Sequence, residues 1–284
     1  MTSYKPGRVL PAVVPAAIVT GSSRGIGAAI ARRFAADGYD VAVNYHTSAE
    51  AAERTAAAVR EAGREAVVVG ADVSDPDGAE RLVTAAAEAF DGVAHLVNNA
   101  GIDQHLHTED LPPEDFDRVM DVNVNSAFNC TKAALPHLRE AARAGDDGER
   151  GPGAGGDANA GADADPDALP DPGPSVCNVS SLLAHTGAAV ECHYAASKGA
   201  LVSLTKSHAA DFAPGIRVNC VAPGHVETDM TSDRTPEEER EELAAIPADR
   251  FGQPADIADA VAYLRDAGFV TGETLHVNGG ERMA

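Results

Sequence analysis

Tryptophan is absent from this chain of 284 residues, aromatic residues make up 4% of it, and only four of its 22 basic residues are lysine. Because 44 residues are acidic, the formal net charge is −22, which argues against nucleic acid as a partner. An acidic, lysine-poor and alanine-rich composition is typical of proteins from salt-loving organisms, in which salt screens the self-repulsion of the chain. A high-GC coding bias without salt adaptation is the alternative interpretation.

Long hydrophobic runs are also lacking: no stretch reaches the ~18 apolar residues that a membrane span requires. The N-terminus has no continuous signal-peptide core. Four cysteines (Cys130, Cys177, Cys192 and Cys220) form no C-x-x-C pair, and three of them fall in or beside predicted helices or strands. We therefore expect a cytoplasmic protein whose cysteines are small buried hydrophobic residues in a reducing compartment.

Short apolar runs alternate with helical patterns along the chain. We predict strands over residues 13–19, 40–44, 66–70, 95–97, 175–180, 216–221 and 274–277. We predict helices over residues 28–37, 48–62, 78–90, 115–143, 194–212 and 254–266, the fourth being interrupted near Pro136. Repeated strand–helix alternation with short connections predicts the α/β class, as a Rossmann-type doubly wound parallel sheet.

One domain is expected to cover residues 1–284, with residues 1–12 as a loose leader. Residues 145–174 contain eight Gly, five Pro and seven Asp and show no apolar periodicity, so they predict a disordered acidic insertion. Because the insertion joins a helix to the next strand, it should emerge at the amino-terminal edge of the sheet, opposite the edge at which ligands bind in such sheets. The polar residues 225–250 are expected to form either a mobile cover over the substrate or, at their acidic run 237–242, a solvated helix face.

A glycine-rich turn, residues 20–27, lies between the first predicted strand and the first predicted helix, which is the context of a dinucleotide-binding fingerprint. Its glycines let backbone N–H groups approach a pyrophosphate at the positive end of the helix. The second strand ends in Asn44-Tyr45-His46 and lacks the carboxylate that often binds the ribose of NAD. Because Arg24 also supplies a cation for a 2′-phosphate, we expect NADP(H) in preference to NAD(H), which is retained as the alternative cofactor.

Three polar residues near one another in the sequence can act on one carbonyl group. Tyr194 and Lys198 are four residues apart, so a helix over residues 194–206 places them on one face. An ammonium beside a phenol favours the phenolate, so we expect Lys198 to lower the pKa of Tyr194. Ser181 follows a predicted strand and has a hydroxyl that can donate to a substrate oxygen. After the third strand, Asp72 is expected either to accept from an adenine amino group or to cap the next helix.

The order of these motifs along the chain resembles that of the short-chain dehydrogenase/reductase family over residues 13–284, apart from 145–174. The resemblance rests on Thr20–Gly27, Asn98–Gly101, Ser181, Tyr194–Lys198, Pro223-Gly224 with Thr228, and Asn278–Gly280. It implies that Tyr194 is the acid/base, that Lys198 lowers its pKa, that Ser181 polarises the carbonyl and that Asn123, five residues before Phe128, anchors a proton relay. The cofactor residues that we predict are Gly21, Ser23, Arg24, Gly25, Ile26, Gly27, Tyr45, Asp72, Val73, Asn99, Ala100, Gly101, Tyr194, Lys198, Pro223, Gly224, Val226 and Thr228.

Within the family, residues 223–230 and 271–280 are most similar to 3-oxoacyl thioester reductases. The resemblance therefore implies NADP(H)-dependent reduction of a 3-oxoacyl thioester, of CoA or of an acyl-carrier protein, by a homotetramer in fatty acid metabolism. An acidic carrier protein is disfavoured because Ala210 and Asp211 stand where docking arginines are expected. The alternatives are a dehydrogenase of another alcohol, such as a sugar, and a non-catalytic nucleotide-binding regulator. We predict no metal site: His105 and His107, with Asp103, Glu109 and Asp110, are interpreted as surface residues.

Overall fold

The computed structural model describes residues 15–90, 92–149, 172–228 and 235–283, and in them seven parallel strands form one sheet in the order β3-β2-β1-β4-β5-β6-β7. The predicted leader, residues 1–12, lies outside these residues. From β1 the chain first adds strands on one side and then, from β4, on the other. The predicted doubly wound α/β sheet is thus confirmed. The strands are β1 (Ala16–Val19), β2 (Asp40–Tyr45), β3 (Ala66–Gly70), β4 (His95–Asn98), β5 (Ser175–Val179), β6 (Arg217–Pro223) and β7 (Thr274–Val277).

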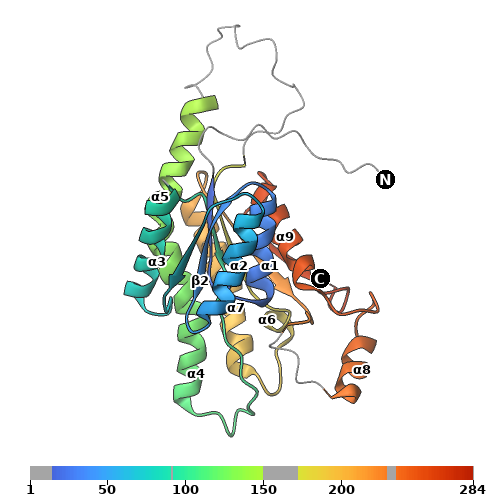
Figure 1. The fold of residues 1–284 in the computed structure, drawn as a ribbon. Helices are drawn as coiled ribbons and strands as arrows, with labels where there is room; N and C mark the ends of the chain where they lie inside the picture. The colour runs from blue at the N-terminus through green and yellow to red at the C-terminus, as the bar shows by residue number, and fades with distance from the viewer. Residues whose placement is uncertain (1–14, 91, 150–171, 229–234, 284) are drawn as a thin grey trace, which may run out of the picture.

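Helices cover both faces of the sheet (Figure 1). One apolar core lies between the sheet and the helices α1 (Gly25–Ala36), α2 (Ala49–Glu61) and α9 (Pro254–Asp266). A second core lies under α3 (Pro76–Phe90) and α5 (Ser126–Glu149), with the end of α7 (Cys192–Phe212) packed against it. Parallel sheets are stable in this three-layer form because both of their faces are removed from water.

The two cores follow from the period-2 alternation of strand side chains. In β1, Ala17 and Val19 belong to the first core, whereas Ala16 and Ile18 belong to the second. All four cysteines are unpaired thiols. Three of them are buried as expected, whereas Cys192, at the start of α7, is partly exposed.

The fourth predicted helix is interrupted at a different place from the one expected. The chain forms α4 (Pro113–Met120), then one π-helical stretch, η1 (Asp121–Asn125), and then α5, which continues through Pro136. The predicted break near Pro136 is therefore wrong. Proline in a helix interior costs about 3 kcal/mol, and the fully buried Cys130, Ala134 and Leu138 of α5 keep it packed in the second core despite that cost.

The end of α5 also corrects the predicted insertion. Residues 145–149 are helical, so the expectation of disorder from residue 145 is wrong for them, and residues 150–171 lie outside the described residues. On the far side of the insertion, the Pro172 carbonyl accepts a hydrogen bond from Arg217 Nε, 2.9 Å away, at the start of β6. The insertion is thus attached at the amino-terminal edge of the sheet, to which the end of α5 also points (Figure 1).

The opposite, carboxyl-terminal edge carries three further short helices, namely α4, α6 (Leu183–Thr186) and α8 (Pro236–Ala244). In Figure 1, α4 and α8 lie beyond this edge. The short helix α6 is not among the predicted elements, whereas the acidic run 237–242 lies in α8 and is helical as expected. Among the described helices, none is both long and apolar enough to cross a membrane.

Candidate active site

The glycine-rich turn packs directly against the end of β4. Gly21 and Gly25 have φ values of +60° and +57°, which favour glycine. Gly27 is required for a different reason: a Cβ there would lie 2.5 Å from Asn99 Nδ2 and 2.6 Å from the Gly21 carbonyl oxygen. Asn99 Nδ2 donates to the carbonyls of Thr20, at 2.9 Å, and Gly21, at 3.1 Å. These contacts fix the backbone close to the start of α1, where an anion is favoured.

A cleft of about 1000 Å³ runs along the carboxyl ends of the strands. All the predicted cofactor residues line it, and so does Ser181. Thr228 lies next to the glycine turn, because a Cβ on Gly25 would be 3.7 Å from Thr228 Cγ2. The glycine cradle and the cleft therefore fit a dinucleotide: residues 21–27 would hold its pyrophosphate, and Val226 and Thr228 its nicotinamide end.

The end of β2 offers no carboxylate to a ribose. Asn44 is buried, its Oδ1 accepts from the Gly21 N–H at 3.1 Å, and its Nδ2 donates to the carbonyls of Val69 and Ala71. Asn44 thus binds the backbone of the glycine turn. The cleft wall beyond it includes Arg24, Tyr45, His46, Thr47 and Ser48, which supply cationic and hydroxyl groups. The carboxylate of Asp72 lies 3.9 Å from His46 Nε2.

Asp72, after β3, makes local hydrogen bonds. Its Oδ1 accepts from the Ser74 N–H at 3.0 Å and from the Ser74 hydroxyl at 2.7 Å. These bonds hold the pKa of Asp72 below its ordinary value, since they stabilise the carboxylate. The alternative that Asp72 caps α3 is wrong, because Asp75 Oδ1 accepts from the Asp77 N–H at the start of that helix, at 3.3 Å. Asp72 organises the turn before α3 and lines the cleft, so a contact with adenine stays a prediction.

Three of the four predicted catalytic side chains, Ser181, Tyr194 and Lys198, line the cleft together. Tyr194 and Lys198 lie one turn apart on α7, with Lys198 Nζ 5.4 Å from the centre of the Tyr194 ring. Lys198 is buried and donates from Nζ to the Val179 carbonyl at the end of β5, at 2.9 Å. Ser181 follows β5 directly, accepts from the Leu183 N–H at 3.1 Å and hydrogen-bonds with Tyr194.

The electrostatics of Tyr194 differ from those expected. Burial raises the pKa of Tyr194 above its ordinary value, and the negative charges of Asp103 and Glu191 raise it further, whereas the hydrogen bond with Ser181 acts in the opposite direction. Burial also lowers the pKa of Lys198 to about 8, because a buried ammonium loses its hydration. The expectation that Lys198 brings the pKa of Tyr194 down is therefore wrong here. Tyr194 is a protonated phenol at neutral pH and is suited to donate a proton.

Asn123 lies in η1, behind the wall of the cleft, with 1% of its surface exposed. Its Oδ1 accepts from the Ile102 N–H at 2.8 Å, and its Nδ2 donates to the Ile102 carbonyl and to the Ser197 hydroxyl, both at 3.0 Å. A Cβ on Gly101 would be 3.2 Å from Asn123 Oδ1 and 3.4 Å from Lys198 Nζ. Asn123, rather than the exposed Asn125, is thus the asparagine next to Lys198.

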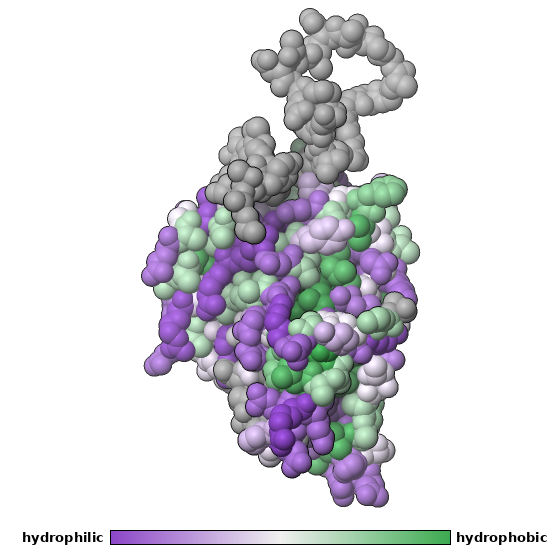
Figure 2. Space-filling view, turned by 90° about the vertical axis from the view of Figure 1, so that its right-hand side faces the viewer, coloured by the Kyte–Doolittle hydropathy of each residue, from purple (hydrophilic) through white to green (hydrophobic). Residues whose placement is uncertain are grey.

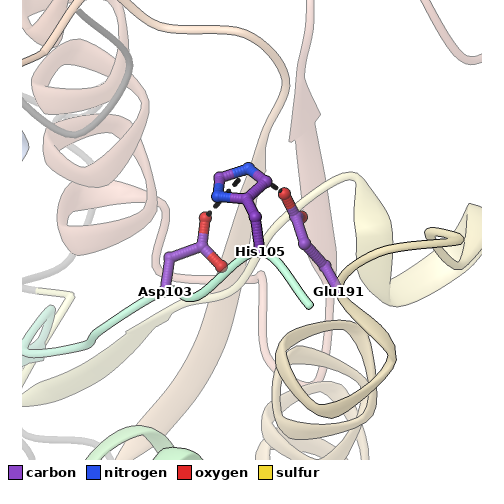
Figure 3. A group of neighbouring side chains, drawn as sticks. All are labelled: Asp103, His105 and Glu191. Carbon is purple, nitrogen blue, oxygen red and sulfur yellow. Dashed lines mark ion pairs between the residues drawn. The ribbon is translucent and has the colours of Figure 1, made fainter. Parts of the chain in front are cut away.

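Sequence reasoning missed one member of the site, Glu191. It is 8% exposed, immediately precedes α7, and contacts His105 from the loop after β4. The second carboxylate, of Asp103, lies 4.0 Å from the same nitrogen of His105, so the two acids approach one imidazole (Figure 3). His105 and Glu191 are 86 positions apart, so the sequence does not reveal this pairing. Only the position of Glu191, three residues before Tyr194, points to it.

The chain matches known families and proteins over most of its length. Residues 15–146 match the family model described as short chain dehydrogenase, and residues 162–281 match the model described as enoyl-(acyl carrier protein) reductase. The chain is 35% identical to the 3-oxoacyl-[acyl-carrier-protein] reductase FabG of Staphylococcus aureus, over 94% of this chain and 98% of that protein. It is 36% identical to glucose 1-dehydrogenase 2 of Bacillus subtilis, over 93% of each chain.

Among solved structures, a short chain dehydrogenase from Burkholderia cenocepacia in complex with NADP superposes with a TM-score of 0.78. It is 34% identical to this chain, and the match covers 94% of this chain and 97% of that one. The chain therefore belongs to the short-chain dehydrogenase/reductase family. It is an oxidoreductase of this NAD(P)-binding class.

Proposed function

We propose that this enzyme uses NADPH to reduce the keto group of a 3-oxoacyl thioester to a hydroxyl group. The observation that carries the reaction type is the convergence of Ser181, Tyr194 and Lys198 at one end of the dinucleotide cleft. The 35% sequence identity to FabG of Staphylococcus aureus, over 94% of this chain, supports the thioester as the substrate.

When bound, NADPH supplies the hydride for the carbonyl carbon. The Ser181 hydroxyl donates to the substrate oxygen and holds it in place. Tyr194 donates its phenolic proton to the same oxygen as negative charge develops there. The phenol is protonated at neutral pH, as the reductive step requires. Lys198 holds the nicotinamide ribose and, while protonated, stabilises the tyrosinate that remains; Asn123 anchors the relay that returns the proton.

NADPH is preferred over NADH because of the wall at the end of β2. Within the described residues, β2 itself ends without a carboxylate, and Arg24 lines the cleft beside His46 and Ser48. The Asp72 carboxylate, 3.9 Å from His46 Nε2, belongs to the turn before α3 and accepts hydrogen bonds from Ser74. A guanidinium binds a 2′-phosphate strongly, whereas a carboxylate at the end of β2 would repel it. The solved relative with bound NADP supports the same preference.

A second substrate class, a polyhydroxylated alcohol such as a sugar, is favoured by the carboxylates of Asp103 and Glu191. Both are close enough to Tyr194 for their charge to raise its pKa. Carboxylates accept hydrogen bonds from neutral hydroxyl groups and repel the phosphates of CoA. The match to glucose 1-dehydrogenase 2 supports this class.

We further propose a homotetramer, in line with the family. Three large hydrophobic residues, Tyr263, Phe269 and Met283, are 57%, 105% and 76% exposed on α9, after it and near the C-terminus. Figure 2 shows apolar surface among polar residues on this side of the molecule. Phe128 on α5 is 46% exposed and marks a second apolar surface, and contact between subunits would remove both from water.

The assay compares NADPH and NADH oxidation with acetoacetyl-CoA, and NADP⁺ reduction with D-glucose, in molar KCl to screen the charge of −22. Turnover of acetoacetyl-CoA with NADPH is expected, and Tyr194→Phe should abolish turnover while NADPH binding, followed by its fluorescence, is kept. Turnover of D-glucose without turnover of acetoacetyl-CoA would favour a polyhydroxylated alcohol as the substrate. Full turnover by Tyr194→Phe would refute the assignment of the acid.

A further inference from the structure

We propose that Asp103, His105 and Glu191 bind a divalent transition-metal cation beside the active site. Their ligand atoms, two carboxylate oxygens and one imidazole nitrogen, all lie within 4.8 Å of one another. Figure 3 shows the two carboxylates pointing toward the same imidazole from two different segments of the chain. The proposal concerns binding and does not depend on which substrate the enzyme reduces.

The three side chains are held in place by bonds outside the group. The N–H of Leu106, next to His105, donates to the carbonyl of Val190, next to Glu191, at 2.7 Å. This bond fixes the loop after β4 against the start of α7. Asp103 uses its Oδ1 to accept from the Gln104 N–H at 2.7 Å, which leaves its Oδ2 as the atom that faces His105. A site that is formed before the ion arrives loses little entropy on binding.

The two carboxylates of the group carry more negative charge than one imidazole can neutralise. The Glu191 residue is 8% exposed and the Asp103 side chain 14%. Within the described part of the chain, the ion pairs of both carboxylates are with His105, and neither has a lysine or arginine partner. Two carboxylates removed from water cost several kcal/mol unless they are neutralised. A protonated imidazole cancels one of the two charges, whereas a divalent cation with a neutral imidazole cancels both.

The donor set indicates which ions fit. One imidazole nitrogen and two carboxylate oxygens are typical ligands of Zn²⁺, and they also suit Mn²⁺. Ca²⁺ takes six to eight oxygens and is not matched by this set. Three protein ligands leave a coordination position open, and His105, whose side chain is 64% exposed, lets ions enter from solvent.

The test uses the full chain, freed of metal by a chelator and desalted into metal-free molar KCl. Zn²⁺ and Mn²⁺ are titrated separately by calorimetry, and bound metal is counted after equilibrium dialysis. We expect one ion per chain, with the affinity lowered at least about tenfold by His105→Ala and by Glu191→Gln. His107→Ala is the matched control, because His107 is exposed in the same loop and lies outside the group.

A readout on the wild-type chain keeps the test decisive if a variant does not fold. Diethyl pyrocarbonate modifies accessible imidazoles, and mass spectrometry locates the modification. Zn²⁺ should protect His105 and leave His107 reactive. No saturable binding, equal losses in His105→Ala and His107→Ala, or equal protection of both histidines would each overturn the proposal, since they indicate ions held only by the acidic surface.

Discussion

Replacing Asn123 tests the geometry of the site and its stability together. In Asn123→Ala, the chain loses the hydrogen bonds of this side chain with the N–H and the carbonyl of Ile102 and with the Ser197 hydroxyl. Each such bond contributes about 1 kcal/mol, so the free energy of unfolding should fall by about 3 kcal/mol. For a chain of this size, that loss lowers the midpoint of thermal unfolding by about 6–12 °C.

The same change should impair catalysis more than substrate binding. Asn123 Oδ1 and Lys198 Nζ both lie within 3.4 Å of the position that a Cβ on Gly101 would occupy. Loss of the amide, which binds both backbone groups of Ile102, therefore frees the loop beside Lys198. A displacement of about 1 Å at a catalytic group costs about 100-fold in rate. We therefore expect kcat for NADPH-dependent reduction to fall by about this factor, with a smaller change in KM.

Asn125→Ala is the control for this experiment. Asn125 is exposed, and its Nδ2 donates to Asp121 on the same helical stretch, so its loss should change stability by less than about 0.5 kcal/mol. Thermal unfolding in molar KCl, monitored by circular dichroism, gives the unfolding midpoint and the change in the free energy of unfolding. Initial rates give kcat. Equal effects of the two substitutions, or a wild-type midpoint for Asn123→Ala, would refute the reasoning.

Three further predictions concern the cofactor, the pH profile and the glycine turn. Arg24→Ala should raise KM for NADPH at least about tenfold more than KM for NADH, because the guanidinium binds the 2′-phosphate. Since Lys198 has a pKa of about 8, its ammonium is lost as the pH rises through that value, so kcat/KM for reduction should decline above about pH 8. In Lys198→Arg, whose guanidinium stays charged, the remaining activity should lack this decline. Gly27→Ala should abolish NADPH binding, since its Cβ would lie 2.6 Å from a backbone oxygen.

Each of these has an outcome that contradicts it. If Arg24→Ala raised KM for NADPH and for NADH by the same factor, Arg24 would not recognise the 2′-phosphate. If kcat/KM of Lys198→Arg still declined above about pH 8, a group other than Lys198 would cause the decline. Gly63→Ala is the control for the glycine turn: its φ of +79° makes alanine cost about 1 kcal/mol, but a Cβ there meets nothing within 4 Å, so NADPH binding should persist.

The sheet and the placement of Tyr194 beside Lys198 were predictable because their determinants are local. The strands are short and largely apolar, and most are followed by glycine or a polar residue. The spacing of Tyr194 and Lys198 places both on one helix face. The π-helical stretch was not predictable, since it positions Asn123 for bonds to Ile102, 21 residues away. The raised pKa of Tyr194 was missed for a similar reason: burial and charges from distant segments dominate it. These effects arise only when the chain is folded.

The attachment of the insertion at the amino-terminal edge has a consequence for how this enzyme tolerates change. The chain enters β5 at that edge and reaches Ser181 at the other, so the length of the connection before β5 does not enter the distance between Ser181 and Tyr194. Doubling such a connection costs only about 0.6 kcal/mol in loop closure. A change in the length of this connection therefore leaves the positions of Ser181 and Tyr194 relative to each other unchanged. A reporter peptide or affinity tag can be placed there, and the edge is a natural point for lengthening the chain.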